Sequence, residues 1–195
     1  MSYPATLQLL IDGEWVSGDG RGTQPVINPA TEEAIGELPH ASVADLDRAL
    51  AAAERGFALW RATAPHERGK IMKRAADLLR ERQADIARIA TIESGKPIVE
   101  TRIELAIAAD TLEWYAEEGR RAYGRVLPQR APGMRLTVLK EPIGPVAAFA
   151  PWNFPLGNPA RKLGAALGAG CSVIIRRAVW SCDTANACSI NTRRR

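Results

Sequence analysis

Cysteine, histidine and long apolar runs are all scarce in this chain of 195 residues. The three cysteines show no C-x-x-C spacing and the two histidines are isolated, so we predict neither a metal site nor a redox pair. No apolar run approaches the ~20 residues of a membrane-spanning helix, and the first residues lack the pattern of a signal peptide. We therefore expect a cytoplasmic protein with no membrane partner.

Charge gives little support for a nucleic-acid partner. Residues 177–195 contain four arginines and one aspartate, which account for +3 of the net charge of +4. A terminal run of three arginines is typical of a solvated end, and no nucleic-acid-binding motif accompanies it. The contents of 46% hydrophobic and 25% charged residues are those of an ordinary globular protein.

A strand-turn-helix-strand pattern covers residues 144–176. The apolar run Val146 to Ala150 leads through a proline-rich turn into a helical segment that opens near Pro155 and ends at residues 168–170. A second apolar run, Ser172 to Ile175, follows, and Cys171 before it is expected to be a small buried hydrophobic residue. Because neither run alternates, we predict parallel strands buried on both faces in a right-handed βαβ unit.

The turn in this unit, residues 151–155, reads Pro-Trp-Asn-Phe-Pro. It lacks the G-x-G-x-x-G pattern that cradles phosphates. The amide of Asn153 is instead a donor that can stabilise a developing oxyanion, on a turn stiffened by two prolines. The alternative interpretation is that Asn153 caps the helix and Trp152 fills the core.

The preceding residues predict strand pairs, then helices, then an extended arm. Strands are expected at residues 9–11, 15–16 and 34–38. A helix capped by Ser42 and Asp45 is expected next, and further helices are expected from Pro65 and from Pro97. The residues expected to face the core of these helices are Leu46, Ala49, Leu50, Ala53, Phe57, Trp60, Ile71, Ala75, Leu78, Leu79, Ile103, Ala106, Ile107 and Trp114. Residues 123–142 alternate as extended arms around a turn.

Several motifs together resemble the aldehyde dehydrogenase superfamily, and in particular its succinate-semialdehyde dehydrogenase branch. They are LIDGEWV, INPATEEAIGELP, ESGKP, RRAYGRVLP, KEPIGPV and PWNFP followed by RKLGAALGAGCSVII. The resemblance covers about residues 8–175. It implies an α/β chain that forms the amino-terminal part of the family's fold, with a helical layer, an oligomerisation-type β arm and the first βαβ unit of an incomplete Rossmann-like domain.

The resemblance also implies domain boundaries. Residues 1–122 are the strands and helices of the cofactor-binding domain, 123–142 the oligomerisation arm and 143–176 the first βαβ of the NAD(P)-binding domain. Residues 177–195 are an anomalous tail, for which we expect a shifted reading frame or disorder. The family carries a lysine and then a glutamate after the second strand, whereas this chain continues with arginine, arginine, alanine and valine.

Site residues follow from the same resemblance. Asn153 is implied as the oxyanion-stabilising amide and Lys162 as a supporting residue of the active-site region. The expected cofactor-binding residues are Ala150, Pro151, Trp152, Asn153 and Arg176. Arg161 resembles the arginine that holds the substrate's distal carboxylate, a task suited to a planar guanidinium. The alternative is that Arg161 and Lys162 are a solvated basic pair.

The expected function is oxidation of an aldehyde, such as succinate semialdehyde or a similar acidic semialdehyde, to the carboxylate with NAD or NADP in a homodimer or homotetramer. In the family a cysteine attacks the aldehyde and a glutamate activates water. Neither Cys182 nor Cys188 has the glycine-containing context of that nucleophile. We therefore expect this chain alone to be inactive and its own cofactor binding to be doubtful. The alternative is a non-catalytic fragment that acts only through subunit association.

Overall fold

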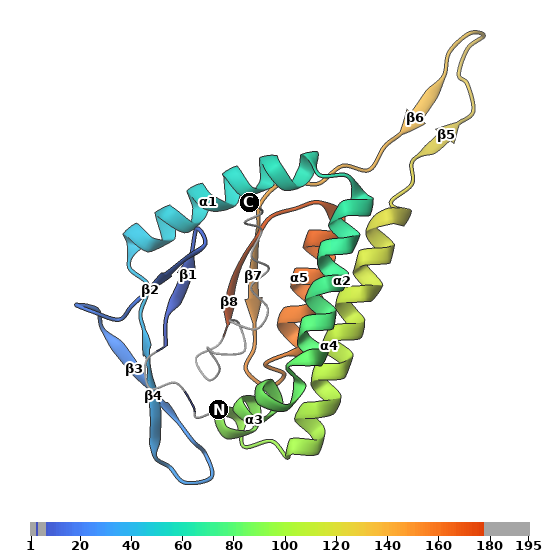
Figure 1. The fold of residues 1–195 in the computed structure, drawn as a ribbon. Helices are drawn as coiled ribbons and strands as arrows, with labels where there is room; N and C mark the ends of the chain where they lie inside the picture. Colours follow the sequence, from blue (N-terminus) through green and yellow to red (C-terminus); the bar gives the residue numbers. More distant parts are fainter. Residues whose placement is uncertain (1–2, 4–6, 178–195) are drawn as a thin grey trace.

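Hairpins, a layer of helices and a parallel strand pair follow one another along the chain (Figure 1). The computed structural model describes residue 3 and residues 7–177. The elements are β1 (Leu9–Ile11), β2 (Glu14–Val16), β3 (Thr23–Ile27), β4 (Ala34–Pro39), α1 (Val43–Ala62), α2 (Pro65–Glu81), α3 (Gln83–Ser94), α4 (Ile98–Glu118), the 3-10 helix η1 (Gly119–Arg121), β5 (Arg125–Leu127), β6 (Leu136–Val138), β7 (Val146–Ala150), α5 (Gly157–Ala169) and β8 (Val173–Arg177). This order confirms the predicted α/β class, with its helical layer, β arm and βαβ unit.

Two antiparallel strand pairs precede the helices. Asp12 and Gly13 both have positive φ, at 55° and 76°, as a two-residue hairpin turn requires. β3 was not predicted, because Pro25 interrupts its pattern and a proline cannot donate to a strand ladder. It is tolerated because β3 pairs only with β4 in the described part of the chain.

Ser42 caps α1 as predicted. The Ser42 main-chain N–H donates to Asp45 Oδ2 at 2.8 Å and the Asp45 N–H donates to Ser42 Oγ at 3.2 Å, which completes a capping box. The Arg21 guanidinium also pairs with the Asp45 carboxylate. Hydrogen bonds from Arg21 and then from Ser42 lower the pKa of Asp45 far below the usual aspartate range.

Only part of the apolar stripe predicted for α1 is buried. Ala53 and Trp60 are 7% and 8% exposed, whereas Leu46 and Leu50 remain 52% and 51% exposed. The main contacts of α1 are with β1 and β8 rather than with another helix. The prediction that the apolar side chains of α1 face the core is therefore wrong for the amino-terminal half of this helix.

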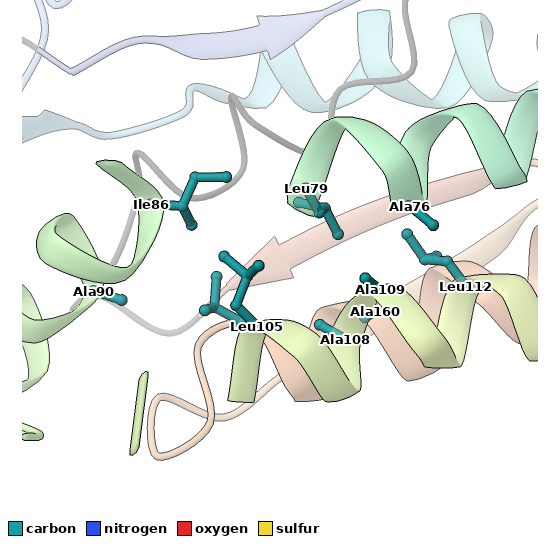
Figure 2. Packing of buried hydrophobic residues seen from close by; sticks show 10 residues of the cluster. Ala76, Leu79, Ile86, Ala90, Leu105, Ala108, Ala109, Leu112 and Ala160 are labelled. Carbon is teal, nitrogen blue, oxygen red and sulfur yellow. The ribbon is translucent and has the colours of Figure 1, made fainter. Parts of the chain in front are cut away.

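The core lies where α2, α4 and α5 pack together, with α3 beside α4 (Figures 1 and 2). Its buried cluster consists of Ala76, Leu79, Ile86, Ala90, Leu105, Ala108, Ala109, Leu112, Leu156 and Ala160. On α2 the buried line runs through Met72, Ala76 and Leu79, one position beyond the predicted Ile71 and Ala75. Half of the cluster is alanine, so the helices approach one another closely.

The predicted inward face of α4 is wrong. Ile103, Ile107 and Trp114 are 56%, 47% and 63% exposed. The residues of α4 that face the core are Thr101, Glu104, Leu105, Ala108, Ala109, Leu112 and Ala116. α5 packs closely against this helix, and a Cβ added at Gly168 would lie 2.6 Å from Tyr115 O. The three predicted side chains are left on the outer face.

β7, α5 and β8 form the predicted parallel βαβ unit, in which Val146 pairs with Val173. α5 begins at Gly157 rather than near Pro155 and is followed by Gly170 in the left-handed region at φ 93°. Burial on both faces of β7 was predicted wrongly, because Ala148 and Ala150 are buried while Phe149 is 65% exposed. In the part of the chain that is described, α5 contacts this strand pair, and the face of β7 that carries Phe149 remains open.

β5 and β6 form an antiparallel arm that projects beyond the helices (Figure 1). Their strands are exposed over almost their whole length, and Val126 and Leu139 are 78% and 72% exposed. The extended conformation predicted for residues 123–142 is thus present, with Gly133 at φ 81° in the turn.

Candidate functional site

The turn between β7 and α5 contains most of the predicted site residues. Trp152 and Phe154 are 57% and 51% exposed, and Asn153 is exposed between them. Trp152 is therefore not a core residue. α5 has no side-chain cap from its own N-cap residue, Leu156, and Asn153 Oδ1 accepts from the Asn158 side chain rather than from a main-chain N–H of the helix. The structure thus disfavours the alternative of an ordinary helix cap with a buried tryptophan.

Asn153 has both of its oxygen atoms engaged by other residues of the site. Its main-chain oxygen accepts a hydrogen bond from Lys96 Nζ at 3.1 Å, and its Oδ1 accepts one from Asn158 Nδ2 at 3.3 Å. With Oδ1 held by Asn158, the side-chain NH2 group of Asn153 faces away from that contact. An exposed amide NH2 group is a hydrogen-bond donor of the kind that can stabilise an oxyanion.

A carboxylate from α4 caps the amino terminus of α5. Glu104 Oε1 accepts hydrogen bonds from the main-chain N–H groups of Leu156 at 2.8 Å and Gly157 at 3.0 Å. The Glu104 side chain is only 5% exposed. An anion is favoured at this end of a helix because unpaired N–H groups and the helix dipole meet there. The position at which a ligand's phosphate binds in many βαβ units is therefore already occupied by a protein carboxylate.

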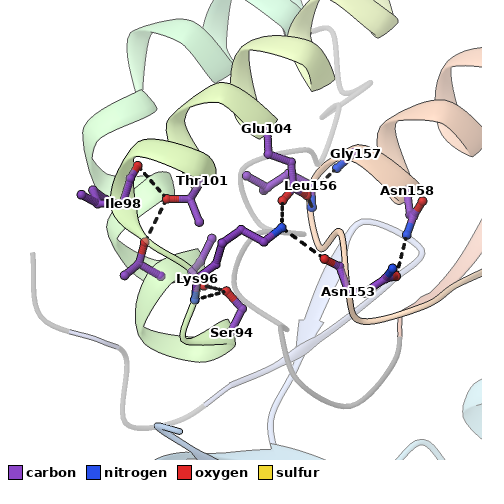
Figure 3. Close-up of polar contacts among 11 residues, drawn as sticks. Ser94, Lys96, Ile98, Thr101, Glu104, Asn153, Leu156, Gly157 and Asn158 are labelled. Atoms are coloured by element: carbon purple, nitrogen blue, oxygen red, sulfur yellow. Dashed lines mark hydrogen bonds and ion pairs between the residues drawn. The ribbon is translucent and has the colours of Figure 1, made fainter. Parts of the chain in front are cut away.

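Lys96 connects this carboxylate to the turn (Figure 3). It lies directly after Gly95, which ends α3 in the left-handed region at φ 69°. The Lys96 Nζ is 2.6 Å from Glu104 Oε2, donates to Asn153 O, and lies 4.3 Å from the centroid of the Phe154 ring. One ammonium group thus contacts α4 and two successive residues of the turn.

A groove of about 270 Å³ lies between α4 and α5 beside this network. Its lining residues are Lys96, Glu100, Ile103, Glu104, Ile107, Phe154, Gly157, Asn158 and Arg161. The groove brings Arg161 together with Asn158 and Phe154, whereas Lys162 does not line it. Arg161 is exposed and has no ion-pair partner among the described residues.

The predicted cofactor-side residues gather at the carboxyl ends of β7 and β8. Ala150 ends β7 and is 6% exposed, and Pro151 follows it at the surface. Arg176 is exposed near the end of β8, in register with Phe149. Ligands of open α/β sheets bind at this edge of the strands.

Sequence reasoning missed the roles of Lys96 and Glu104. Lys96 was noted only as part of the motif ESGKP, and Glu104 was not singled out. Glu104 lies on the same side of α4 as Leu105 and Ala108, so a charge within the buried stripe was the available signal. That signal depended on identifying the correct face of α4.

Among the described residues, no group of three or more histidine, cysteine or acidic side chains is arranged to hold a metal ion. The helices seen in residues 7–177 all fall short of the length or apolar character needed to cross a bilayer. Cys171 is a free cysteine and is buried, at 3% exposed, as predicted.

Comparison with known proteins identifies relatives of the whole described region. Residues 15–189 match the aldehyde dehydrogenase family, so the match extends past residue 175, where the motif resemblance ends. The 4-(hydroxymethyl)benzenesulfonate dehydrogenase TsaD1 of Comamonas testosteroni is 50% identical over 171 residues, which are 88% of this chain and 36% of that protein. The glutarate-semialdehyde dehydrogenase of Pseudomonas aeruginosa is 45% identical over 171 residues, which are 88% of this chain and 35% of that protein. Residues 178–195 lie outside the described residues.

Several solved structures are also similar to this chain. The succinate-semialdehyde dehydrogenase of Burkholderia pseudomallei has a TM-score of 0.90 and 42% identity, over 94% of this chain and 38% of that one. PnpE in complex with nicotinamide adenine dinucleotide has a TM-score of 0.89 and 32% identity, over 94% of this chain and 38% of that one. The chain spans little more than a third of the length of the relatives it matches. Since the family match covers most of its residues, the chain belongs to the aldehyde dehydrogenase family.

Proposed function

We propose that this chain contributes the oxyanion, cofactor-side and substrate-anion residues of an NAD(P)-dependent enzyme that oxidises an acidic semialdehyde to the carboxylate. Succinate semialdehyde and similar acidic semialdehydes are the expected substrates. The observation that carries the proposal is the groove between α4 and α5, in which Arg161 lies beside the turn that bears Asn153. An aldehyde held with its carbonyl group at the turn can extend its acidic end along this groove.

Arg161 is proposed to bind the anionic end of the substrate. Its guanidinium is exposed in the groove without an ion-pair partner among the described residues, so it is available to a ligand. The names of two relatives, a benzenesulfonate dehydrogenase and a glutarate-semialdehyde dehydrogenase, each denote a compound with an anionic group. A planar guanidinium can bind either a sulfonate or a carboxylate through two hydrogen bonds.

Asn153 is proposed to donate its side-chain NH2 group to the carbonyl oxygen as negative charge develops on it. Such a donor acts most strongly when it is already oriented before the reaction, since no reorganisation is then required. The contact from Asn158 to Oδ1 supports this orientation. Lys162 is proposed as a supporting positive charge on the exposed side of α5.

The residues at the carboxyl edge of β7 and β8 fit the nicotinamide end of a dinucleotide. Trp152 presents an exposed aromatic face, Ala150 and Pro151 lie directly before it, and Arg176 is exposed at the neighbouring strand end. Because Glu104 occupies the amino terminus of α5, we place no cofactor phosphate there. When bound, NAD(P)+ supplies the hydride acceptor for the oxidation.

The test is Arg161→Ala in a complete enzyme that carries this segment. Loss of a charged hydrogen bond costs roughly 1.5–3 kcal/mol, so kcat/KM for succinate semialdehyde should fall about 10- to 150-fold. The kcat/KM for a neutral aldehyde of similar length should change little. Arg120→Ala, which removes an exposed arginine of η1, is the matched control. Equal losses on both aldehydes would reject the proposed role of Arg161.

Subunit association is a second candidate function, because the β5–β6 arm exposes apolar side chains. Val126, Leu139 and Ile143 are 78%, 72% and 90% exposed. Apolar side chains grouped on a projecting arm are typical of a surface that another chain covers. We propose a second copy of this chain as the partner, in a dimer or tetramer.

A further inference from the structure

The ion pair between Lys96 and Glu104 is buried, yet its hydrogen bonds are directed at the turn between β7 and α5. The two side chains are 16% and 5% exposed. Burying an ion pair costs desolvation free energy, and two apolar side chains of similar volume often stabilise a fold at least as well. The stability of the core alone therefore does not explain the presence of these charges.

The two Glu104 oxygens have different partners. Oε1 accepts from the N–H groups of Leu156 and Gly157, and Oε2 lies 2.6 Å from Lys96 Nζ. The carboxylate consequently holds the last part of the turn and orients the lysine at the same time. Its position on α4 is rigid because the same side of the helix packs in the core.

The Lys96 ammonium reaches the other part of the turn. It donates to the main-chain oxygen of Asn153 and lies over the Phe154 ring. Gly95, which precedes Lys96, lies close to Pro29, since a Cβ at that position would lie 2.8 Å from Pro29 Cγ. The peptide of Asn153 is thus held from one side while the N–H groups three and four residues later are held from the other.

We propose that Lys96 and Glu104 are positioning residues that hold the turn so that the Asn153 amide meets the reacting carbonyl oxygen. This inference rests on the role proposed above for Asn153. With the backbone held at both ends of the turn, only the side-chain torsions of Asn153 remain free, and Asn158 restricts those. Small displacements of a catalytic group lower rates steeply, so a device that holds the backbone has a direct effect on the reaction.

The first experiment uses ¹⁵N NMR of the 195-residue chain with Lys96→Met and Glu104→Gln. Methionine keeps the length of the lysine side chain and loses its hydrogen bonds, whereas glutamine keeps the shape of glutamate and loses its charge. Matched controls are Lys70→Met and Glu113→Gln, which alter exposed ion pairs on α2 and α4. Each sample is measured for amide hydrogen exchange, for the side-chain NH2 signals of Asn153 and for its denaturant unfolding midpoint.

We expect Glu104→Gln to raise amide exchange at Leu156 and Gly157 about tenfold, the effect of weakening a charged hydrogen bond, and both variants to shift the Asn153 NH2 signals. Core amides of α4, such as that of Leu112, should keep their exchange rates, and the controls should change none of these signals. Glu104→Ala should show the same loss of exchange protection at Leu156 and Gly157. Added formate can occupy the position of the removed carboxylate and should restore protection at these two amides.

A second measurement separates positioning from general stability. In a complete enzyme that carries this segment, Lys96→Met should lower kcat and leave the KM for the aldehyde nearly unchanged, and Lys96→Arg should restore part of kcat. Unchanged turn signals would overturn the proposal. So would an equal loss of protection throughout α4 and α5, or failure of both conservative variants to fold, because the pair would then hold the fold rather than the turn. The NMR result does not depend on Arg161, so it can fail or succeed independently of the proposed substrate.

Discussion

The direction in which the Asn153 amide faces depends on one neighbouring side chain. Asn158 Nδ2 donates to Asn153 Oδ1 at 3.3 Å, and this contact leaves the NH2 group of Asn153 as the exposed donor. Asn158 also lines the groove that contains Arg161. A single residue on the first turn of α5 therefore connects the proposed oxyanion donor to the proposed substrate groove.

Asn158→Asp should reverse the Asn153 amide, because a carboxylate accepts hydrogen bonds and cannot donate to Oδ1. In a complete enzyme that carries this segment, kcat should fall by up to about 100-fold, which approaches the loss of an oxyanion donor. Asn158→Ala, which removes the partner without attracting the NH2 group, should cost less. Equal kcat values for the two variants would show that Asn158 does not set the orientation of the amide.

The Asp45 carboxylate should make the stability of the chain sensitive to acid. Its pKa is lowered in the folded chain by Arg21 and then by Ser42, so its contribution is present above the pKa of an unfolded aspartate and is lost as the pH falls below about 4. Asp45→Asn should lower the free energy of unfolding more at pH 7 than at pH 3. The measurement is denaturant unfolding at both pH values, with Asp47→Asn as a control on the exposed side of α1. A pH-independent difference would contradict this assignment.

At the scale of elements, the packing of α4 against α5 determines where the site lies. Gly164 and Gly168 both face Tyr115, and a Cβ at these glycines would lie 2.8 Å from its Cδ2 and 2.6 Å from its main-chain oxygen. The same close packing places Glu104 at the amino terminus of α5. Geometry at the turn consequently depends on small residues two and three helical turns away.

Gly168→Ala should destabilise the chain by about 1–3 kcal/mol, the range for overpacking a close contact. Its new methyl group would meet backbone, which cannot rotate aside. Gly164→Ala should cost less, since the Tyr115 ring can shift. Gly56→Ala on α1 is the control, because its Cβ would lie 3.9 Å from the nearest atom, Ser172 Cβ. Denaturant unfolding measures all three, and a Gly168→Ala variant as stable as Gly56→Ala would refute the close packing.

At the scale of the whole molecule, several places among the described residues expose apolar side chains, and three of them lie away from α1 and the β7–α5 turn. These are the outer face of α4 with Ile103 and Trp114, the open face of β7 with Phe149, and the β5–β6 arm with Val126. Monomeric proteins rarely leave so many large apolar side chains uncovered. We expect these surfaces to be covered by another polypeptide, either a second copy of this chain or part of a longer protein.

Val126→Glu should weaken self-association of the 195-residue chain, because a charge would be buried in the contact that the arm is proposed to make. Sedimentation velocity at several concentrations should show an oligomer for the unmodified chain and a shift toward monomer for the variant. Gln129→Glu adds the same charge on the same arm and is the control. A monomeric unmodified chain, or equal association of both variants, would count against the arm as the interface.

Local sequence patterns were sufficient for much of the fold. The Ser42–Asp45 capping box, the strand at residues 9–11 and the βαβ order were all predicted correctly. Each of these features depends on interactions within a few residues, which a short stretch of sequence specifies. The position of Asn153 on an exposed turn was predictable for the same reason.

Only the tertiary structure decided which faces are buried and which distant side chains meet. Hydrophobic periodicity placed Ile103 and Trp114 inside, whereas helix packing buries a different face of α4 and leaves these two side chains outside. Lys96, Glu104 and Asn153 are far apart in the sequence and form one network because α4 and α5 pack side by side. Sequence by itself therefore determined the family, most of the elements and the turn that carries Asn153. Helix packing determined which distant residues are held together there, because that packing depends on contacts between segments with no local signal for one another.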